Sequence, residues 1–485
     1  MSLRLREQPQ LTLLLTLFLT LQALPPANYL RSTDRFNYQI TEPNPNTPLT
    51  MTQKKLSQQA ELEMLQRESF SYFMHETNPK NGLVIDKSAP GWPASVAAVG
   101  LALAAYPVAV ERGFIPRAEA ITRVLTTLKF FWNSPQGPEP DATGYKGFYY
   151  HFLDMSTGRR VWNCELSTID SAFLLAGALT AGRYFDAATK DETEIRTLAE
   201  ALYLRADWQW AQANGGAVSM GWLPESGFIP YRWKGYDEAL LLYILGFGSP
   251  THPLSDNSYE DWASEYKWEN SYGYDYLYAG SLFTHQLSHI WIDFRGIQDT
   301  FMRTKGIDYF ENSRRATVVQ QQYAIDNPHG FVGYGACCWG ITASDGPGPI
   351  SLEVNGVKRE FFDYVARGVP HGPDDGTIAP WVVVASLPFA PEIVLPTIDH
   401  FIHEIGLKAG NPYGFKATYN PTYPGKSHNP YGWVSHWHFG INEGPIILMV
   451  ENYRSELLWH LMRDCPYIAT GLRRAGFAGG WLGTQ

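Results

Sequence analysis

Apolar residues recur at helical spacing through most of the chain from about residue 55 onward. In KKLSQQAELEMLQRESFSYFMHE the apolar positions Leu62, Leu65, Phe70 and Phe73 fall roughly on one face of a helix. Similar apolar patterning predicts further helices over about 94–107, 115–132, 167–184, 192–210, 237–246, 277–293, 296–325, 391–407 and 443–463. The pattern therefore predicts a predominantly helical protein.

Long connections rich in Gly, Pro, Trp, Tyr and Asp separate these helices, for example over 221–235 and 334–349. Loops of such length in a compact domain are usually functional. A single β-hairpin is predicted in SLEVNGVKREFF (351–362), because Asn355-Gly356 is a strong hairpin-turn signal. No Pro/Ser linker divides the chain after residue 57, so we expect residues 58–485 to form one helical toroid with a loop-lined cleft.

The N-terminus has the pattern of a secretory signal peptide. Arg4 and Arg6 precede the apolar stretch Leu11 to Leu24, which is too short to span a bilayer comfortably. We assign residues 1–30 to this signal, with an uncleaved anchor as the alternative because no clean small-x-small triplet follows. The turn-rich stretch TEPNPNTPLT places a linker over 31–57. The expected location is the periplasm or the exterior.

Composition narrows the classes of partner. The formal net charge is −10 and no basic run or basic amphipathic helix is present, so we expect no nucleic acid partner and, after signal cleavage, no membrane partner. Trp, Tyr and Phe reach 14% of the residues, and such side chains suit surfaces that stack on sugar rings, although most must belong to the core. The cysteines match no zinc pattern but allow one long-range disulfide: Cys164, Cys337, Cys338 and Cys465.

Two acids stand between an aromatic cluster and an apolar helix in YRWKGYDEALLLYILGFGSP (231–250). Hydrolysis of a glycosidic bond needs a carboxylic acid that protonates the leaving oxygen, and apolar surroundings keep such an acid protonated. Glu238 has such apolar surroundings and is a candidate for this acid. The alternative is a purely structural role, in which its negative charge interacts with the dipole at the start of the helix. Asp237 suits the start of the helix or sugar binding. The upstream Trp233 and Tyr236 are expected to shape sugar subsites.

A similar arrangement occurs in VWNCELSTIDSAFLLAGAL (161–179). Ser167 to Asp170 resembles an N-terminal capping pattern, which explains Asp170 more simply than catalysis does. Glu165 is not needed for the cap and is a candidate for a catalytic role.

Three polar residues recur at four-residue steps in FTHQLSHIWIDFRG (283–296): His285, His289 and Asp293. On a helix they would share one face. The glutamate of a HExxH protease is absent, so we expect these residues to bind sugar hydroxyls rather than a metal.

Acids also stand beside Gly or Pro at three later junctions between loops and regular elements. An Asp-Gly pair is ordinarily a turn, but three such junctions favour a cleft mouth. The candidate sugar-binding acids at these junctions are Asp345, Asp374, Asp375 and Glu443. Trp339, Trp381, Trp433 and Trp437 are candidate stacking platforms, although the core is the more common place for any one of them.

Five blocks in the same order resemble the bacterial glucoamylase-like domain, found in glycoside hydrolase family 144 and at the C-terminus of cyclic β-1,2-glucan synthases. The resemblance covers most of 60–465. It lies in YRWKGYDEALLLYILGFGSPTHPL, LFTHQLSHIWIDFRG, GITASDGPGP, DDGTIAPWVVVASLPFAPE and INEGPIILMVENYRS.

This resemblance implies an all-α (α/α)6 toroid that cleaves β-1,2-glucan, internally or by releasing sophorose, with inversion and without a cofactor. It implies that Glu238 is the general acid and that Glu165 is a second acid needed for activity. The base stays open. Family members often read Asp-Gln-Gly-Pro where this chain has Asn442-Glu443-Gly444-Pro445, which moves the acid by one residue.

Three other functions stay open from the sequence. A retaining transglycosylase acting on β-1,2-glucan would use the same residues with a shorter separation between its carboxylates. A glucan-binding protein could keep the fold without turnover. A polysaccharide lyase is the weaker alternative, since it would need a Tyr or His base and a uronate-neutralising side chain.

Overall fold

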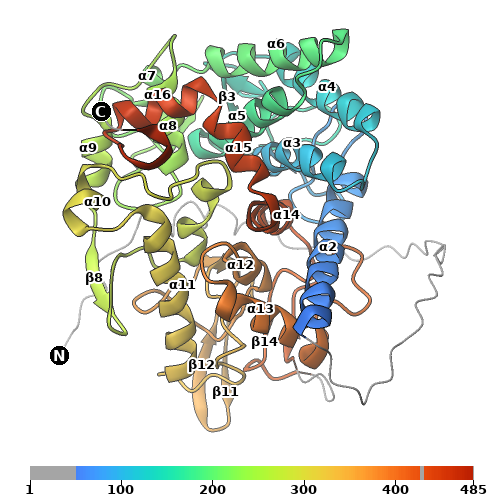
Figure 1. Cartoon of the computed structure of the whole chain (residues 1–485), viewed down its shortest axis with the longest axis vertical. Coiled ribbons are helices and arrows are strands. Elements are labelled where there is room, and N and C mark those ends of the chain that lie inside the picture. The colour runs from blue at the N-terminus through green and yellow to red at the C-terminus, as the bar shows by residue number, and fades with distance from the viewer. Residues whose placement is uncertain (1–50, 426–430, 484–485) are drawn as a thin grey trace.

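The computed structural model describes residues 51–425 and 431–483, and Figure 1 shows them as a ring of helices. The segments of the inner ring are almost wholly buried. Its members are α3 (Val96–Glu111), α5 (Thr168–Tyr184), α8 (Leu240–Gly248), η1 (Leu282–His285), η2 (Leu287–Ile290), α12 (Pro380–Ala385) and α14 (Gly440–Ser455). Helix α3 packs against α5 and α14, α5 packs against α8, and α14 packs against α12. The ring closes through η1 and η2, because Ser288 accepts a hydrogen bond from the Leu241 backbone on α8 and Gln286 donates one to α12.

An outer layer of amphipathic helices covers this ring. The outer helices are α2 (Met51–His75), α4 (Arg117–Asn133), α6 (Lys190–Arg205), α11 (Tyr309–Asp326), α13 (Pro391–Asp399) and α16 (Pro466–Arg474). Outer and inner segments alternate in sequence, as in an (α/α)6 toroid, except that none of these outer helices stands between α8 and η1. Helix α16 instead packs beside α8 (Figure 1). Shorter pieces are α7 (Trp208–Ala211), α9 (Ser258–Ala263), α10 (Thr300–Lys305), η3 (His400–Ile405), α15 (Leu457–Arg463) and η4 (Gly480–Leu482).

Short strands lie in the connections. One sheet has the order β2-β3-β5-β6-β7, with β2 (Gly144–Tyr145), β3 (Phe148–Tyr150), β5 (Leu166–Ser167), β6 (Gly221–Leu223) and β7 (Gly227–Phe228). Four further pairs are antiparallel: β1 (Ala94–Ser95) with β4 (Phe152–Leu153), β8 (Trp268–Ser271) with β9 (Tyr274–Leu277), β10 (Ala343–Ser344) with β13 (Val365–Ala366), and β14 (Tyr419–Asn420) with β15 (Trp433–Val434).

The predicted hairpin is confirmed as β11 (Ile350–Val354) and β12 (Val357–Phe361). Its turn residues Asn355 and Gly356 both have positive φ, at 52° and 76°, which is why this dipeptide suits the turn.

Strands β1 and β5 lead directly into inner helices and end in serine caps. Ser95 Oγ accepts a hydrogen bond from the Ala98 backbone, and Ser167 Oγ accepts one from the Asp170 backbone. Each cap satisfies an N–H group that the helix leaves unpaired. The capping pattern predicted at Ser167 is therefore confirmed. These caps fix where the side chains at the N-terminal ends of α3 and α5 are placed.

The single helix predicted over 277–293 is wrong. The chain forms the short 3₁₀ helices η1 and η2, which meet at Gln286. Gln286 donates to Val382 O on α12 at 2.7 Å, while Ser288 Oγ donates to Glu238 O at 3.1 Å. These contacts hold successive residues against different neighbours and override the helical spacing. His285, His289 and Asp293 consequently do not share one helix face.

Three other predicted helices are interrupted. Residues 296–325 divide into α10 and α11, because Gly306 ends α10 in the left-handed conformation and Asp308 caps α11. Glu456, also left-handed, separates α14 from α15. Residues 192–210 divide into α6 and α7, because Asp207 caps a new helix. The helix predicted over 391–407, by contrast, continues without a break from α13 into the π-helical turn η3.

The predictions for the N-terminus have different outcomes. Helix α2 begins at Met51, inside the range predicted as linker. The signal peptide prediction lies outside the described residues. Among the helices of 51–425 and 431–483, none combines the length and apolarity needed to cross a membrane. All four cysteines are free, so the long-range disulfide that the sequence allowed is not formed.

Candidate active site

A central cavity of about 150 Å³ lies where the N-terminal ends of the inner segments converge. Residues just before or at the start of α3, α5, α8, α12 and α14 all contribute to its wall, together with η1 and η2. Aromatic and aliphatic side chains make up most of the wall, and three residues carry carboxyl groups. The polar lining consists of Asp86, Ser95, His151, Asp170, Glu238, Tyr364 and Asn442. Such a mixture suits a sugar with one reacting bond.

Glu238 lies on this wall as the sequence predicted. Its Oε2 atom is buried and has no hydrogen-bond partner among the described residues. Burial, reinforced by the neighbouring carboxylates of Asp237 and Asp170, raises the pKa of Glu238 to about 8. A carboxyl group with this pKa is mostly protonated at neutral pH. It can therefore donate a proton to an oxygen atom in the cavity.

Asp237 points away from the central cavity and holds the start of α8. Its Oδ1 accepts hydrogen bonds of 3.0 Å from both the Ala239 backbone and the Trp262 indole. Burial raises the pKa of Asp237 as well. The helix-starting role that the sequence offered for Asp237 agrees with these contacts.

Asp237 and Tyr236 also border a second cavity of about 500 Å³, together with Lys234, Glu265 and Lys267. Tyr236 itself is buried and stacks on Tyr309 at 5.6 Å between ring centroids.

A partly buried histidine that the sequence pattern does not single out connects two of the predicted acids. His151 Nδ1 lies 2.8 Å from Glu165 Oε1, and its Nε2 lies 3.7 Å from Asp170 Oδ1. Although burial opposes the charged form, Asp170 and Glu165 raise the pKa of His151 to about 9. His151 is thus an imidazolium at neutral pH. Glu165 orients it, and Glu165 is not part of the central cavity wall.

Asp170 takes part in the cap of α5 and also lies in the wall of the central cavity. Its Oδ2 accepts a hydrogen bond from Ser167 Oγ at the cap of α5, and its carboxylate also lines the cavity. Burial raises the pKa of Asp170, and the charge of His151 opposes that rise.

Asp86 is a further residue of the cavity wall, and the sequence pattern does not predict it. It precedes β1 and receives a hydrogen bond of 3.1 Å from the Trp92 indole to Oδ2. Burial raises the pKa of Asp86 to about 6, against the opposing charges of His151 and Lys87. A weak signal was present in the sequence, since an acid stands between two apolar runs at the entry to a buried helix. Nothing in the pattern linked it to Glu238.

Some of the predicted aromatic residues border the central cavity, and others belong to the core. Trp233 and Trp381 line the central cavity, and the Trp233 indole donates to Thr168 Oγ1 at 3.0 Å. Trp339 is buried in the core and donates to Thr397 Oγ1.

His285 and His289 are buried side chains of the protein interior rather than parts of either cavity wall. Burial lowers the pKa of His285 to about 4 and that of His289 to about 3, so both are neutral. Asp293 is paired with Arg295 at 2.8 Å and with Arg463. The expected polar stripe facing a cleft is therefore not formed by these three residues.

The later acids also hold loops in place. Asp375 makes two 2.8 Å contacts with the buried Arg367. Asp374 accepts hydrogen bonds from Tyr323 and Tyr334. None of the later acids lines either cavity. The other two are Asp345, bound by Thr418 and Ser435, and Glu443, paired with His438.

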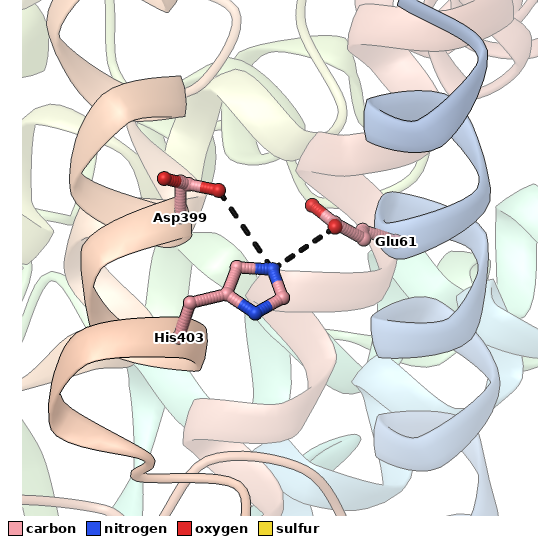
Figure 2. Close-up of side chains that lie close together, drawn as sticks. All are labelled: Glu61, Asp399 and His403. Atoms are coloured by element: carbon pink, nitrogen blue, oxygen red, sulfur yellow. Dashed lines mark hydrogen bonds and ion pairs between the residues drawn. The ribbon is translucent and has the colours of Figure 1, made fainter. Parts of the chain in front are cut away.

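One cluster on the outside of the toroid could hold a metal ion (Figure 2). His403 Nε2 lies 3.1 Å from Glu61 Oε1 and 3.7 Å from Asp399 Oδ1, joining η3 to α2 and α13. His403 is 54% exposed and Asp399 is 63% exposed, and the contacts are those of surface ion pairs. None of the three lines the central cavity.

The chain is similar to known proteins in sequence and in structure. A family model named Glycoamylase, described as "Putative glucoamylase", matches residues 230–466. An exo β-1,2-glucooligosaccharide sophorohydrolase from Parabacteroides distasonis is 27% identical over 469 residues, which cover 90% of this chain. This chain spans 61% of the length of that relative.

Two solved structures are similar over most of the chain. A "putative glucoamylase" from Bacteroides uniformis has a TM-score of 0.77 and 30% identity, covering 88% of this chain and 98% of its own. A β-1,2-glucanase from Parabacteroides distasonis has a TM-score of 0.75 and 26% identity, covering 88% of this chain and 60% of its own.

Proposed function

The chain belongs to the glucoamylase-like family, and on that premise we propose that it is a glycoside hydrolase that cleaves β-1,2-glucan. The sophorohydrolase and β-1,2-glucanase among its relatives support this substrate. The single observation that carries the proposal is the state of Glu238. Its buried Oε2 faces no partner and its raised pKa keeps it protonated in a cavity lined by aromatic side chains.

In the proposed reaction Glu238 is the general acid. It gives its proton to the oxygen that joins two glucose units while that bond breaks, which leaves Glu238 as a carboxylate. A water molecule attacks the anomeric carbon from the opposite face and inverts it. The water loses its proton to a base. Trp233 and Trp381 border this cavity but are almost fully buried, so they shape its wall rather than offer an open stacking face.

We assign the base to Asp86. The central cavity wall has three carboxyl groups in the described residues, and Glu238 is the acid among them. Asp170 is bound to Ser167 and lies beside the imidazolium of His151, whereas the Asp86 carboxylate is held by the Trp92 indole. With a pKa of about 6, Asp86 is ionised at neutral pH and still basic enough to accept a proton.

The roles of the remaining predicted residues follow from their contacts. Glu165 acts through His151, whose positive charge faces Asp170 and Asp86. Glu165 and His151 are therefore positioning residues. Asp237 holds the first turn of α8 and so the backbone that carries Glu238. Export of the chain to the periplasm or the exterior belongs to the same proposal and agrees with the polymeric nature of the substrate.

The direct test is incubation of the purified protein with β-1,2-, β-1,3- and α-1,4-glucans, followed by sizing of the products. The proposal expects sophorose or longer β-1,2-linked products from the first glucan alone. NMR of the first-formed anomer separates inversion from the retention that a transglycosylase would show. Binding of β-1,2-glucan without turnover would contradict the proposal in favour of a glucan-binding protein.

A further inference from the structure

A further depression of about 410 Å³, separate from the two cavities described above, is bordered by two tryptophans. Trp92 and Trp162 pack edge to face, with ring centroids 4.9 Å apart and planes at 72°. Ile85, Pro93, Asp154, Met155, Ser156 and Val161 complete its border together with Gly91.

Direct contacts connect this depression to the proposed site of reaction. Trp162 packs against Phe152 at 5.3 Å between ring centroids, and Phe152 lines the central cavity. On the other side, the Trp92 indole donates to Asp86, which also lines the central cavity. A chain of sugar units that leaves the central cavity past Phe152 or Asp86 would therefore reach these rings.

Trp162 lies in a backbone turn that is strained for a bulky residue. Trp162 and Asn163 have φ values of 58° and 51°, and Cys164 N donates to Val161 O at 3.1 Å across the turn that they form. This left-handed turn favours Asn-Gly, and a bulky residue at its first central position is strained. Trp162 is also 42% exposed, so core packing does not account for it. An exposed aromatic ring in a strained turn indicates function.

The chemistry of the two rings indicates a neutral sugar. Lys87 Nζ lies 3.8 Å from the centroid of the Trp92 ring and holds it in place. The exposed indole of Trp162 offers an apolar face of the kind that stacks on a pyranose ring, while Asp154 and Ser156 lie at the border of the same depression.

We infer that Trp162, supported by Trp92, forms a distal subsite that binds a glucose unit of a β-1,2-glucan chain whose reacting bond lies at Glu238. This inference rests on the proposed function and adds a preference for longer chains. Short substrates that fill only the central cavity do not reach Trp162, whereas longer chains gain its stacking energy.

The experiment compares Trp162→Asn, Trp162→Phe and the control Trp132→Ala with the parent chain. Trp132 on α4 is 40% exposed and lies on the outer layer, so it matches Trp162 in exposure but not in place. For long β-1,2-glucan, Trp162→Asn should raise KM about tenfold, the size expected for one aromatic stacking contact. Its kcat on that glucan and its kcat/KM on the shortest cleaved oligosaccharide should be unchanged.

Stability separates this role from a structural one. Asn tolerates the left-handed turn, which offsets the lost ring contacts with Trp92 and Phe152, so Trp162→Asn should change the melting temperature little. Trp162→Phe should restore most of the affinity. An unchanged ratio of long-chain to short-chain kcat/KM in Trp162→Asn would overturn the subsite. So would an equal rise of KM for both substrates.

The proposed function can fail separately. If the parent chain cleaves none of the glucans, affinity electrophoresis in β-1,2-glucan still compares the parent chain with Trp162→Asn. Retardation of the parent chain that is lost in Trp162→Asn would keep the subsite while the hydrolase proposal falls. Equal mobility of the two proteins would overturn the subsite.

Discussion

His151 Nδ1 lies 2.8 Å from Glu165 Oε1, so an acid that the sequence predicted to be catalytic instead holds a partly buried histidine in the wall of the central cavity. The other ring nitrogen faces Asp170. This relationship gives Glu165 an indirect role, because it fixes the position and the charge of an imidazolium that faces two carboxylates of the cavity wall.

The charge of His151 should appear in the stability of the protein. Its pKa in the folded state, about 9, lies above the ordinary value of 6.5, so its contribution is fully present below pH 6.5 and is lost as the pH rises through about 9. His151→Gln should lower the free energy of unfolding by about 3 kcal/mol at pH 6, because it leaves Glu165 buried without its partner. The deficit should shrink at pH 9.5. Urea unfolding at the two pH values measures it, and a pH-independent deficit would contradict the assignment.

Activity should have a bell-shaped dependence on pH. Asp86 must be ionised to accept a proton and has a pKa of about 6, whereas Glu238 must be protonated and has a pKa of about 8. The value of kcat/KM should therefore be greatest near pH 7 and fall on either side. Initial rates on β-1,2-glucan between pH 4.5 and pH 9.5 test this. Full activity extending above pH 9 would be incompatible with Glu238 as the acid.

The assignment of the base can be tested with two matched variants. Asp86→Asn should lower kcat by about 10³, the range expected for loss of a general base, with little effect on stability. Asp170→Asn should lower stability more, because Asp170 contacts both Ser167 and His151. If Asp170→Asn removed turnover without loss of stability while Asp86→Asn stayed active, the two roles would have to be exchanged.

The later acids should act on stability rather than on sugar binding. Arg367 and Asp375 form an ion pair in which both side chains are fully buried. Asp375→Ala should lower the free energy of unfolding by about 3–5 kcal/mol, because it leaves the guanidinium unpaired. Asp256→Ala is the control, since that carboxylate is 95% exposed in its pair with Arg474 and should change little. Thermal and urea unfolding compare them, and an intact stability in Asp375→Ala would return Asp375 to the list of sugar-binding candidates.

Much of the fold could be predicted from the sequence because its signals are local. Apolar runs and serine caps define α3 and α5, and Asn355-Gly356 defines the hairpin. The helix predicted over 277–293 failed because Gln286 and Ser288 bond to distant segments, which no periodicity reveals. Long-range contacts therefore determined the structure of this segment.

Only part of the site could be predicted, because sequence patterns show local surroundings and not contacts between distant segments. Glu238 stood out because its apolar surroundings are close in sequence, and they also govern its pKa. Asp86 and His151 reach the cavity from separate loops, so only the closed ring brings them to Glu238. The acids beside glycines, such as Asp374 and Asp375, turned out to hold loops through Tyr323, Tyr334 and Arg367.

The turnover of Glu238→Gln on β-1,2-glucan tests the central claim most directly, because this change keeps the shape of the side chain and removes only its ability to give a proton. The parent chain should release β-1,2-linked products, and the variant should lose at least 10³-fold in kcat while its melting temperature and glucan affinity stay the same. A folded Glu238→Gln protein that hydrolyses the glucan at the parent rate would contradict the account.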